Sequence, residues 1–302
     1  MSSNDIVVVG SCMIDFVSYA PRLPKSGETI HGKEFATNFG GKGANQCVAA
    51  AKLGGDVALV ARVGDDIWGP KYIDNLNKLG VNTDYVRITE GVSIGVAQIT
   101  VSDLGENQII IVAGANHCLT AADVELAQDI ITKAAVLVLQ LETSQDVAIR
   151  AIQLCRGISI LNGAPALTDF NPQLLKLPTI FCVNETEASV FTGGLPVNNI
   201  CEAQNAASAL IEKGCNSVII TLGSRGAIYV DNKEKFHVCS PTVKSVDTTG
   251  AGDAFIGALA FLLATETNIS MRRAVEKACL AASDSVTRPG TQISFPGPSI
   301  LQ

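Results

Sequence analysis

The chain has 302 residues, of which 47% are hydrophobic and 5% aromatic, and it carries a formal net charge of −7. This acidic balance argues against nucleic acid or an anionic membrane as the main partner, and no apolar run is long enough to span a bilayer. Nine cysteines are scattered singly and no secretory leader begins the chain, so we expect a cytoplasmic protein with reduced thiols, present in the nucleus as well in a eukaryotic cell.

The first predicted element is a buried strand at Ile6–Val9, a β-branched run that ends in a turn of small residues. Asp15 follows the carboxyl end of this strand, where open α/β sheets bind ligands. For a lone aspartate, however, a solvated loop carboxylate is the better interpretation. From 16 to 38, prolines and short polar–apolar alternation predict hairpins instead of helix.

A glycine-rich segment leads into the next predicted helix. Gly40, Gly41 and Gly43 surround Lys42, and a pair of glycines ends the helix. The pattern is not a P-loop, because G-x-x-x-x-G-K-[S/T] is absent. Lys42 alone could be a surface cation, and Asn45 alone a polar helix face. Together with three glycines they favour a cradle for a polar ligand.

The middle of the chain alternates between sheet and helix patterns. We predict a strand at 57–63, a helix at 66–79, hairpin strands at 94–101 and 108–112, a helix at 121–133 and a strand at 135–141. No helix separates the two hairpin strands, so we expect them to pair with the earlier hairpin region in a small sheet apart from the main one. Glu142 ends the last of these strands, which is suggestive of a ligand site and no more.

Two later segments admit more than one interpretation. Helices are predicted at 146–155, 185–192 and 200–213, and strands at 158–161, 179–183, 217–222, 227–230 and 234–239. From the residues alone, Asn184 and Glu187 favour a role at the positive end of a helix dipole, although they could also hold water on Mg²⁺. The turn Gly223-Ser224-Arg225-Gly226 would offer backbone groups to a nucleotide, but a plain hairpin would look the same.

The functional interpretation depends most on the segment 247–255. Gly250 and Gly252 flank one alanine, Asp253 follows, and a long apolar run predicts a helix. Unpaired N–H groups at a helix N-terminus favour an anion, and Asp253 would accept the proton of a hydroxyl that attacks phosphorus. By itself the pattern fits an ordinary capped helix about equally well. A last helix is predicted at 271–287.

In these motifs the chain resembles the ribokinase-like, pfkB-type sugar kinases over essentially its whole length. Segment 40–46 is similar to the N-terminal signature of that family, and segment 247–253 is similar to the C-terminal one. Segments 183–187 and 221–226 lie between them in the expected order.

The resemblance implies an α/β fold with a three-layer α/β/α core around a mostly parallel sheet, in one kinase domain that spans 1–302. It also implies a small β-sheet lid inserted in that domain, built from 13–38 and 92–113. In the family this lid covers the sugar and often pairs with the lid of a second subunit, so a homodimer is expected.

The resemblance also assigns roles to individual residues. Asp253 would take the proton from the 5-hydroxyl of D-ribose, and the anion hole would be formed by the N–H groups of Gly250, Ala251 and Gly252. The sugar positions correspond to Asp15, Gly41, Lys42, Gly43, Asn45 and Glu142. The ATP positions correspond to Asn184, Thr221, Leu222, Gly223, Ser224, Arg225, Gly226 and Gly252, with Cys279 beside the adenine. Glu187 would support Mg²⁺ through water, and an activating K⁺ would be held by Asp247, Thr249, Ser285, Arg288, Gly290 and Ser294.

Met13 departs from the family pattern, in which many members carry an asparagine that hydrogen-bonds the sugar. A thioether donates no hydrogen bond, so we hypothesise that this substrate-binding position accepts 2-deoxyribose as well as ribose. The open alternatives are a 2-deoxyribokinase, another pfkB-type kinase, and a non-enzymatic sugar or nucleotide sensor, which an intact Asp253 disfavours. A nicotinamide-dependent enzyme is rejected because no G-x-G-x-x-G follows the first strand.

Overall fold

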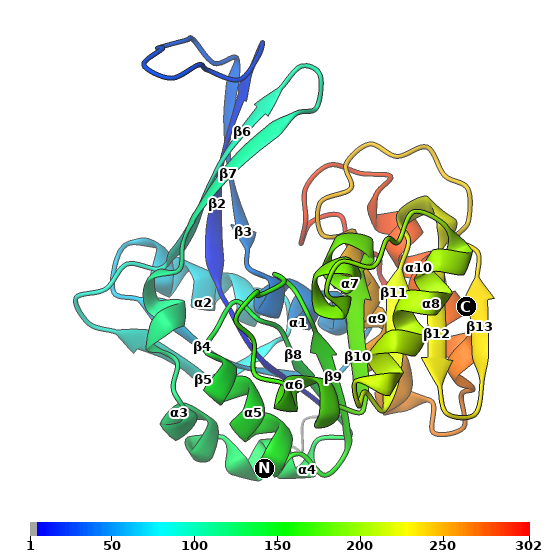
Figure 1. The fold of residues 1–302 in the computed structure, drawn as a ribbon. Coiled ribbons are helices and arrows are strands. Elements are labelled where there is room, and N and C mark those ends of the chain that lie inside the picture. The colour runs from blue at the N-terminus through cyan, green and yellow to red at the C-terminus, as the bar shows by residue number, and fades with distance from the viewer. Residues whose placement is uncertain (1–4) are drawn as a thin grey trace.

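A nine-stranded sheet with helices on both faces forms the body of the protein in the computed structural model, which describes residues 5–302 (Figure 1). Its strands are β1 (Ile6–Val9), β4 (Val57–Gly64), β5 (Asn82–Thr89), β8 (Val136–Leu139), β9 (Ile158–Asn162), β10 (Ile180–Asn184), β11 (Ser217–Thr221), β12 (Ala227–Asp231) and β13 (Lys235–Val238). The order is β13-β12-β11-β10-β9-β8-β1-β4-β5. Strands β11 to β5 run parallel, and β12 and β13 are added antiparallel at one edge.

Alternate side chains of the central strands enter two separate hydrophobic layers. Ile6 and Val8 belong to one cluster of buried residues, and Val7 and Val9 belong to the other. The first cluster is covered by α1 (Lys42–Lys52), α2 (Trp68–Lys78), α9 (Ala251–Thr265) and α10 (Met271–Ser285). The second is covered by α3 (Ala121–Leu126), α4 (Gln128–Lys133), α5 (Gln145–Leu154), α6 (Gln173–Lys176), α7 (Glu185–Thr192) and α8 (Ile200–Glu212). Short 3₁₀ turns occur at η1 (Gly114–Cys118), η2 (Gly223–Arg225) and η3 (Pro298–Leu301).

A second sheet of four strands projects from one end of the body (Figure 1). It consists of β2 (Met13–Ala20), β3 (Glu34–Gly40), β6 (Gly95–Ser102) and β7 (Asn107–Val112), in the order β3-β2-β6-β7. The two hairpins meet through a parallel pairing of β2 with β6, and the outer pairings are antiparallel. The predicted pairing of the two hairpin regions is therefore confirmed.

The predicted fold class, an α/β core with a mostly parallel sheet and a small second sheet, is likewise confirmed. Within residues 5–302, no helix combines the length and apolar character that crossing a membrane requires.

Three local expectations were wrong. The helix predicted at 121–133 is two helices, α3 and α4, because Ala127 leaves helical geometry between them. Strand β5 was missed, since it lies at a sheet edge with mostly polar, partly exposed side chains and lacks a clear alternation. Gly43 does not precede a helix but lies inside α1, which begins at Lys42.

Asp15 is also placed differently from the loop position expected for it. Only three residues separate β1 from β2, so the chain passes directly from the main sheet into the small one. Asp15 lies inside β2, paired with Asn38 on one side and Ala97 on the other. A strand position holds its carboxylate more firmly than a loop would.

Candidate active site

The N-terminus of α9 opens onto a cavity of about 180 Å³. Gly250 precedes the helix with φ of 78°, a left-handed conformation that suits glycine. Around Gly252 the space is open, because a Cβ built there would meet nothing within 4 Å. The first helical bond runs from Ala254 N–H to the Gly250 carbonyl at 2.8 Å, so the N–H groups before it lie outside the helix ladder. Of these, Ala251 N–H donates to Thr248 at 3.2 Å.

Asp253 lines this cavity and connects the two glycine motifs. Its Oδ2 accepts a hydrogen bond from Asn45 Nδ2 at 3.0 Å, and its Oδ1 accepts one from Gln46 Nε2 at 2.9 Å. Both donors lie in the first turns of α1. The side chain is buried, yet the carboxylate faces the cavity, so it is neither walled off nor distant from the first glycine cluster.

The charge of Lys42 is balanced by four carboxylates of the site. Burial lowers the pKa of Lys42, but the negative charges of Asp253, Glu142, Glu187 and Asp15 together raise it above its usual value. Burial raises the pKa of Asp253, while Lys42 and the two amide donors lower it. The site therefore combines one cationic side chain, Lys42, with four acidic side chains from separate parts of the chain.

Asp15 shows the clearest electrostatic effect in this group. Burial raises its pKa to about 7, and the negative charges of Glu142 and Asp253 add to the shift, whereas Lys42 opposes it. Its carboxyl group packs closely against Gly40, where a Cβ would meet Asp15 Oδ2 at 2.3 Å. Only glycine leaves room for the carboxylate at this point of the turn.

Glu142 holds the start of α1. Its Oε2 accepts from Lys42 N–H at 2.9 Å and from Ser11 Oγ at 2.5 Å. Ser11 Oγ in turn accepts from Gly43 N–H at 3.2 Å. Met13 is buried at the start of β2, where it pairs with Gly40 and Gly95 and places no polar group at this position.

Asn184 and Glu187 form a capping box at the start of α7 and also line the cavity. Asn184 N–H donates to Glu187 Oε2 at 2.8 Å, and Glu187 N–H donates to Asn184 Oδ1 at 2.9 Å. The helix-terminus interpretation is thus confirmed. The capping box uses Oε2 of Glu187, so the carboxylate can still accept hydrogen bonds from a further ligand.

The turn after β11 closes a hairpin with β12. Thr221 lines the cavity, but the Leu222 side chain is buried in the hydrophobic core, so only its backbone is available to a ligand. Arg225 forms an ion pair with Glu185 at 2.8 Å. Cys279 is buried on α10 and is absent from the cavity lining.

Comparison with known proteins shows the family of the chain. The family described as pfkB family carbohydrate kinase matches residues 3–298. The chain belongs to the pfkB family. It is 46% identical over 296 residues to a ribokinase of Mus musculus, covering 96% of this chain and 91% of that one, and 41% identical over 295 residues to a deoxyribokinase of Salmonella typhi, covering 97% and 95%. The structure of Arabidopsis thaliana ribokinase complexed with ribose and ATP superposes with a TM-score of 0.89 at 32% identity, covering 99% of this chain and 98% of that one. The predicted enzyme class, an ATP-dependent sugar kinase, is confirmed.

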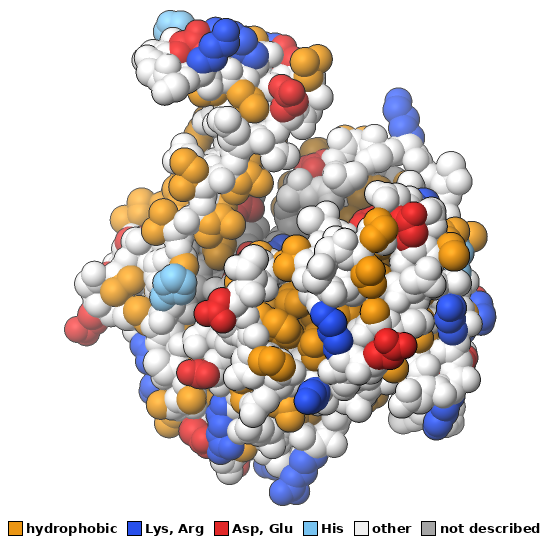
Figure 2. Space-filling model, in the orientation of Figure 1, with side chains coloured by type: hydrophobic (Ala, Val, Ile, Leu, Met, Phe, Trp, Pro, Cys, Tyr) orange, Lys and Arg blue, Asp and Glu red, His pale blue; other side chains and the backbone are white. Residues whose placement is uncertain are grey.

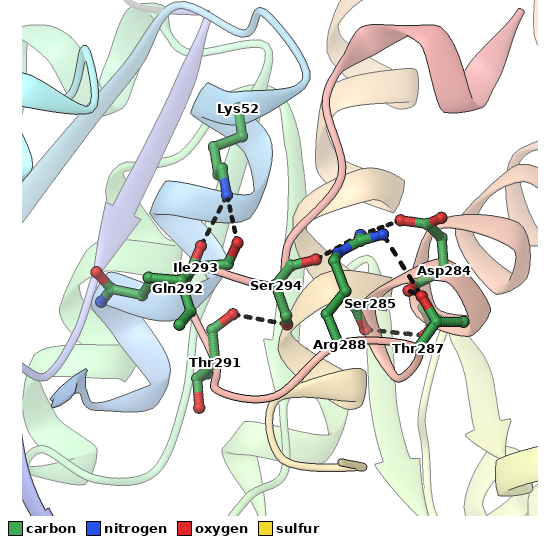
Figure 3. A network of polar contacts seen from close by, with 10 residues as sticks. Lys52, Asp284, Ser285, Thr287, Arg288, Thr291, Gln292, Ile293 and Ser294 are labelled. Atoms are coloured by element: carbon green, nitrogen blue, oxygen red, sulfur yellow. Dashed lines mark hydrogen bonds and ion pairs between the residues drawn. The ribbon is translucent and has the colours of Figure 1, made fainter. Parts of the chain in front are cut away.

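In this pfkB kinase, the residues expected around K⁺ fall into two hydrogen-bonded groups. Asp247 accepts from Thr249 N–H and from Gly290 N–H, each at 2.9 Å. Figure 3 shows the second group, in which the Arg288 guanidinium donates to the Ser294 carbonyl at 2.7 Å. The backbone N–H of Arg288 donates to the Ser285 carbonyl at 3.4 Å.

These groups offer mainly carbonyl and carboxylate oxygens, the ligands that suit a hard monovalent ion. Among residues 5–302, no cluster of three or more His, Cys, Asp or Glu has the arrangement of a metal site. The oxygen set fits a weakly held ion, and the K⁺ assignment stays a prediction.

Three polar residues of the candidate site were not predicted from the sequence motifs. Ser11, Gln46 and Gln292 are all buried, and they hold Glu142, Asp253 and Asn45 respectively. Gln46 directly follows Asn45 in the glycine-rich segment 40–46, and this position is the only sequence feature that could have identified it as a site residue.

Proposed function

We propose that this kinase transfers the γ-phosphoryl group of ATP to the 5-hydroxyl of D-ribose, giving ribose 5-phosphate and ADP. The observation that carries the proposal is the position of Asp253, which lies at the head of α9, lines the cavity and is held by two amide donors from α1. The Mus musculus and Arabidopsis thaliana relatives, both ribokinases, support the choice of ribose and ATP.

Asp253 acts as the base in this proposal. The carboxylate accepts the hydroxyl proton as the sugar oxygen forms a bond to the γ-phosphorus, and the bond from that phosphorus to the β,γ-bridging oxygen breaks to release ADP. The N–H groups at the head of α9, of Gly250, Ala251 and Gly252, would stabilise the charge of the transferring group, and that of Ala251 would exchange its bond to the Thr248 carbonyl for one to a phosphoryl oxygen. Lys42 adds a positive charge on the same cavity wall.

The sugar is proposed to bind between the small sheet and the start of α1. Asp15 on β2 and Glu142 after β8 present carboxylates, and Asn45 presents an amide. Figure 2 shows the small sheet overhanging a hollow in the body. A lid at this place would exclude water that otherwise competes for the phosphoryl group.

Two cations complete the proposal. Mg²⁺, carried by ATP, would be supported through water by Glu187 and would neutralise phosphate charge. K⁺ would sit beside the head of α9 against Asp247 and the carbonyl oxygens of the loop at 285–294, and would add a positive charge behind the anion hole.

A second candidate substrate is 2-deoxyribose. The buried Met13 thioether supplies no hydrogen bond where a sugar hydroxyl would need one, and the Salmonella typhi relative at 41% identity is a deoxyribokinase. The same site chemistry serves either sugar, since the transferred group goes to the 5-hydroxyl in both.

An ATP-to-ADP assay across a panel of pentoses, with and without K⁺, tests both candidates. We expect sugar-dependent ADP release with ribose or 2-deoxyribose far above that with other sugars, and stimulation by K⁺. ADP release that no pentose stimulates would contradict the proposed function.

A further inference from the structure

Gln292 lies in the loop after α10, and its side-chain amide is buried and hydrogen-bonded at both ends. Its Nε2 donates to Asn45 Oδ1 at 3.1 Å and to Tyr72 Oη at 3.0 Å. Its Oε1 accepts from Asn75 Nδ2 at 3.1 Å. Because both amide hydrogens and the oxygen have partners, the neighbours fix which way the amide points.

The first arm of this network ends on the carboxylate of Asp253. Asn45 Oδ1 accepts from Gln292, so the other end of the Asn45 amide, Nδ2, must face Asp253, to which it donates at 3.0 Å. The Asp253 carboxylate itself favours this orientation, because the reversed amide would place an oxygen against it. Gln292 holds the opposite end of the same amide, so it restrains Asn45 in the position from which it supports the charged form of Asp253.

The second arm ends on Gly40, where the chain turns from β3 into α1. Tyr72 is fully buried, accepts from Gln292 and donates from its hydroxyl to the Gly40 carbonyl at 2.5 Å. Gly40 precedes Gly41, the residue directly before α1, which has φ of 90°. One glutamine is thus hydrogen-bonded to supports of both Asp253 and the glycine turn.

The backbone around Gln292 is anchored independently of its side chain. Lys52 Nζ donates to the Gln292 carbonyl at 2.9 Å and to the Ile293 carbonyl at 3.2 Å. Figure 3 shows Lys52 directed at these two oxygens, while the Gln292 side chain points away from Arg288. Truncating the Gln292 side chain therefore leaves the loop attached to α1.

We propose that Gln292 is a positioning residue for phosphoryl transfer, which fixes the Asn45 amide against Asp253 and, through Tyr72, the turn at Gly40. This inference rests on the proposed function of Asp253 as the base. Gln292 acts through these residues and is not offered as a contact of sugar or nucleotide.

The test compares Gln292→Ala and the nearly isosteric Gln292→Glu with the unaltered enzyme. We expect kcat to fall about tenfold, because the Asn45 amide then holds the charged Asp253 carboxylate less firmly, with little change in KM for ATP. The acid limb of the pH profile of kcat should move to higher pH, because the Asp253 carboxylate binds its proton more tightly when the hydrogen bond from Asn45 is weakened. Asp15, Lys42, Glu142 and Glu187, the charged groups that face Asp253, are unchanged in both variants. Gln292→Glu adds a carboxyl group of its own, so the pH shift is judged on Gln292→Ala, which adds no charge.

Two further variants separate positioning from a loss of structure. Ser299→Ala alters an exposed side chain in η3, beyond the proposed ion site, and should leave the pH profile of kcat unchanged. In the Asn45→Ala background, Gln292→Ala should have almost no additional effect on the acid limb, since the link to Asp253 is already gone. Full additivity of the two substitutions would overturn the proposal.

A titration of ¹³C-aspartate-labelled enzyme by NMR gives a readout that needs no substrate. The Asp253 signal, identified by its loss in Asp253→Asn, should titrate at higher pH in Gln292→Ala than in the unaltered enzyme. If Asp253 titrates alike in both, the positioning role is wrong whichever sugar the kinase uses. If the shift is present but no pentose is phosphorylated, the proposed function fails instead.

Discussion

Asn45 donates a hydrogen bond of 3.0 Å to Asp253, although 208 positions separate the two residues along the chain. The contact exists because α1 and α9 pack side by side on the same face of the main sheet. Their N-terminal ends converge, which brings the first glycine motif to the second. Phosphoryl transfer depends mainly on positioning and charge, so this packing is the structural basis of the proposed chemistry.

Replacing the proposed base should separate binding from turnover. In Asp253→Asn we expect ATP and sugar to bind nearly as before, while kcat falls by about 10²- to 10⁴-fold, the usual contribution of a general base. Isothermal titration and a coupled ADP assay measure the two quantities. Asp129→Asn, on the exposed surface of α4, is a matched control. Near-normal turnover in Asp253→Asn would remove this residue from the role.

The close approach of α1 and α9 should depend on Gly257. A Cβ at this position would meet Ala49 Cβ at 2.5 Å and the Gln46 carbonyl at 2.6 Å. Gly257→Ala should therefore destabilise the protein by about 1–3 kcal/mol and lower kcat by moving Asn45 away from Asp253. Urea unfolding and kinetics measure the two effects. Gly297→Ala is the control, because a Cβ there would meet only the Lys52 carbonyl, at 3.9 Å; equal effects of both substitutions would contradict this reasoning.

Sugar binding should depend on pH through Asp15, whose pKa is raised to about 7. Above this pH the charged carboxylate accepts hydrogen bonds from sugar hydroxyls, and below it the protonated group accepts them poorly. We therefore expect KM for the sugar to rise as the pH falls through about 7, and to level off above it.

Two variants test that assignment. Asp15→Asn should give a KM that is high and no longer changes near this pH. Glu142→Gln should move the inflection to lower pH, because the negative charge of Glu142 contributes to the raised pKa of Asp15. An inflection that persists in Asp15→Asn would mean that another group titrates.

The sequence was sufficient to predict most strands and helices, the two glycine motifs and Asp253, because each of these has a local pattern. Ser11 and Gln292 have none. Both are single polar residues whose importance comes from partners at least 32 positions away, such as Gly43 for Ser11. Strand β5 was missed for a related reason. It is a strand because it pairs with β4, and its sequence shows no clear alternation of polar and apolar residues.

The sugar preference should respond to Met13. Met13→Asn introduces an amide that can hydrogen-bond a sugar hydroxyl, so kcat/KM for ribose relative to 2-deoxyribose should rise by about tenfold. The buried position makes a stability check necessary, and Met13→Leu keeps the site apolar as a control. If Met13→Asn folds normally but leaves the ratio unchanged, this residue does not determine the preference.

The outer strand of the small sheet should mediate a homodimer. All six residues of β7 are exposed, and Ile109, Ile110 and Ile111 expose more than half of their surface. Figure 2 shows hydrophobic side chains along the projecting sheet. An apolar edge strand of this kind needs a cover, and we propose a second copy of the chain.

A charge placed in that strand tests the dimer. Ile110→Lys should shift the protein from dimer to monomer in sedimentation velocity, because burying an unpaired ammonium group in an interface is unfavourable. Leu126→Lys is a matched control, since Leu126 is an apolar residue on α3, in the body of the protein, that also exposes more than half of its surface. If both variants sediment as the unaltered protein does, β7 is not the interface. If the unaltered protein is itself a monomer at micromolar concentration, no such dimer forms.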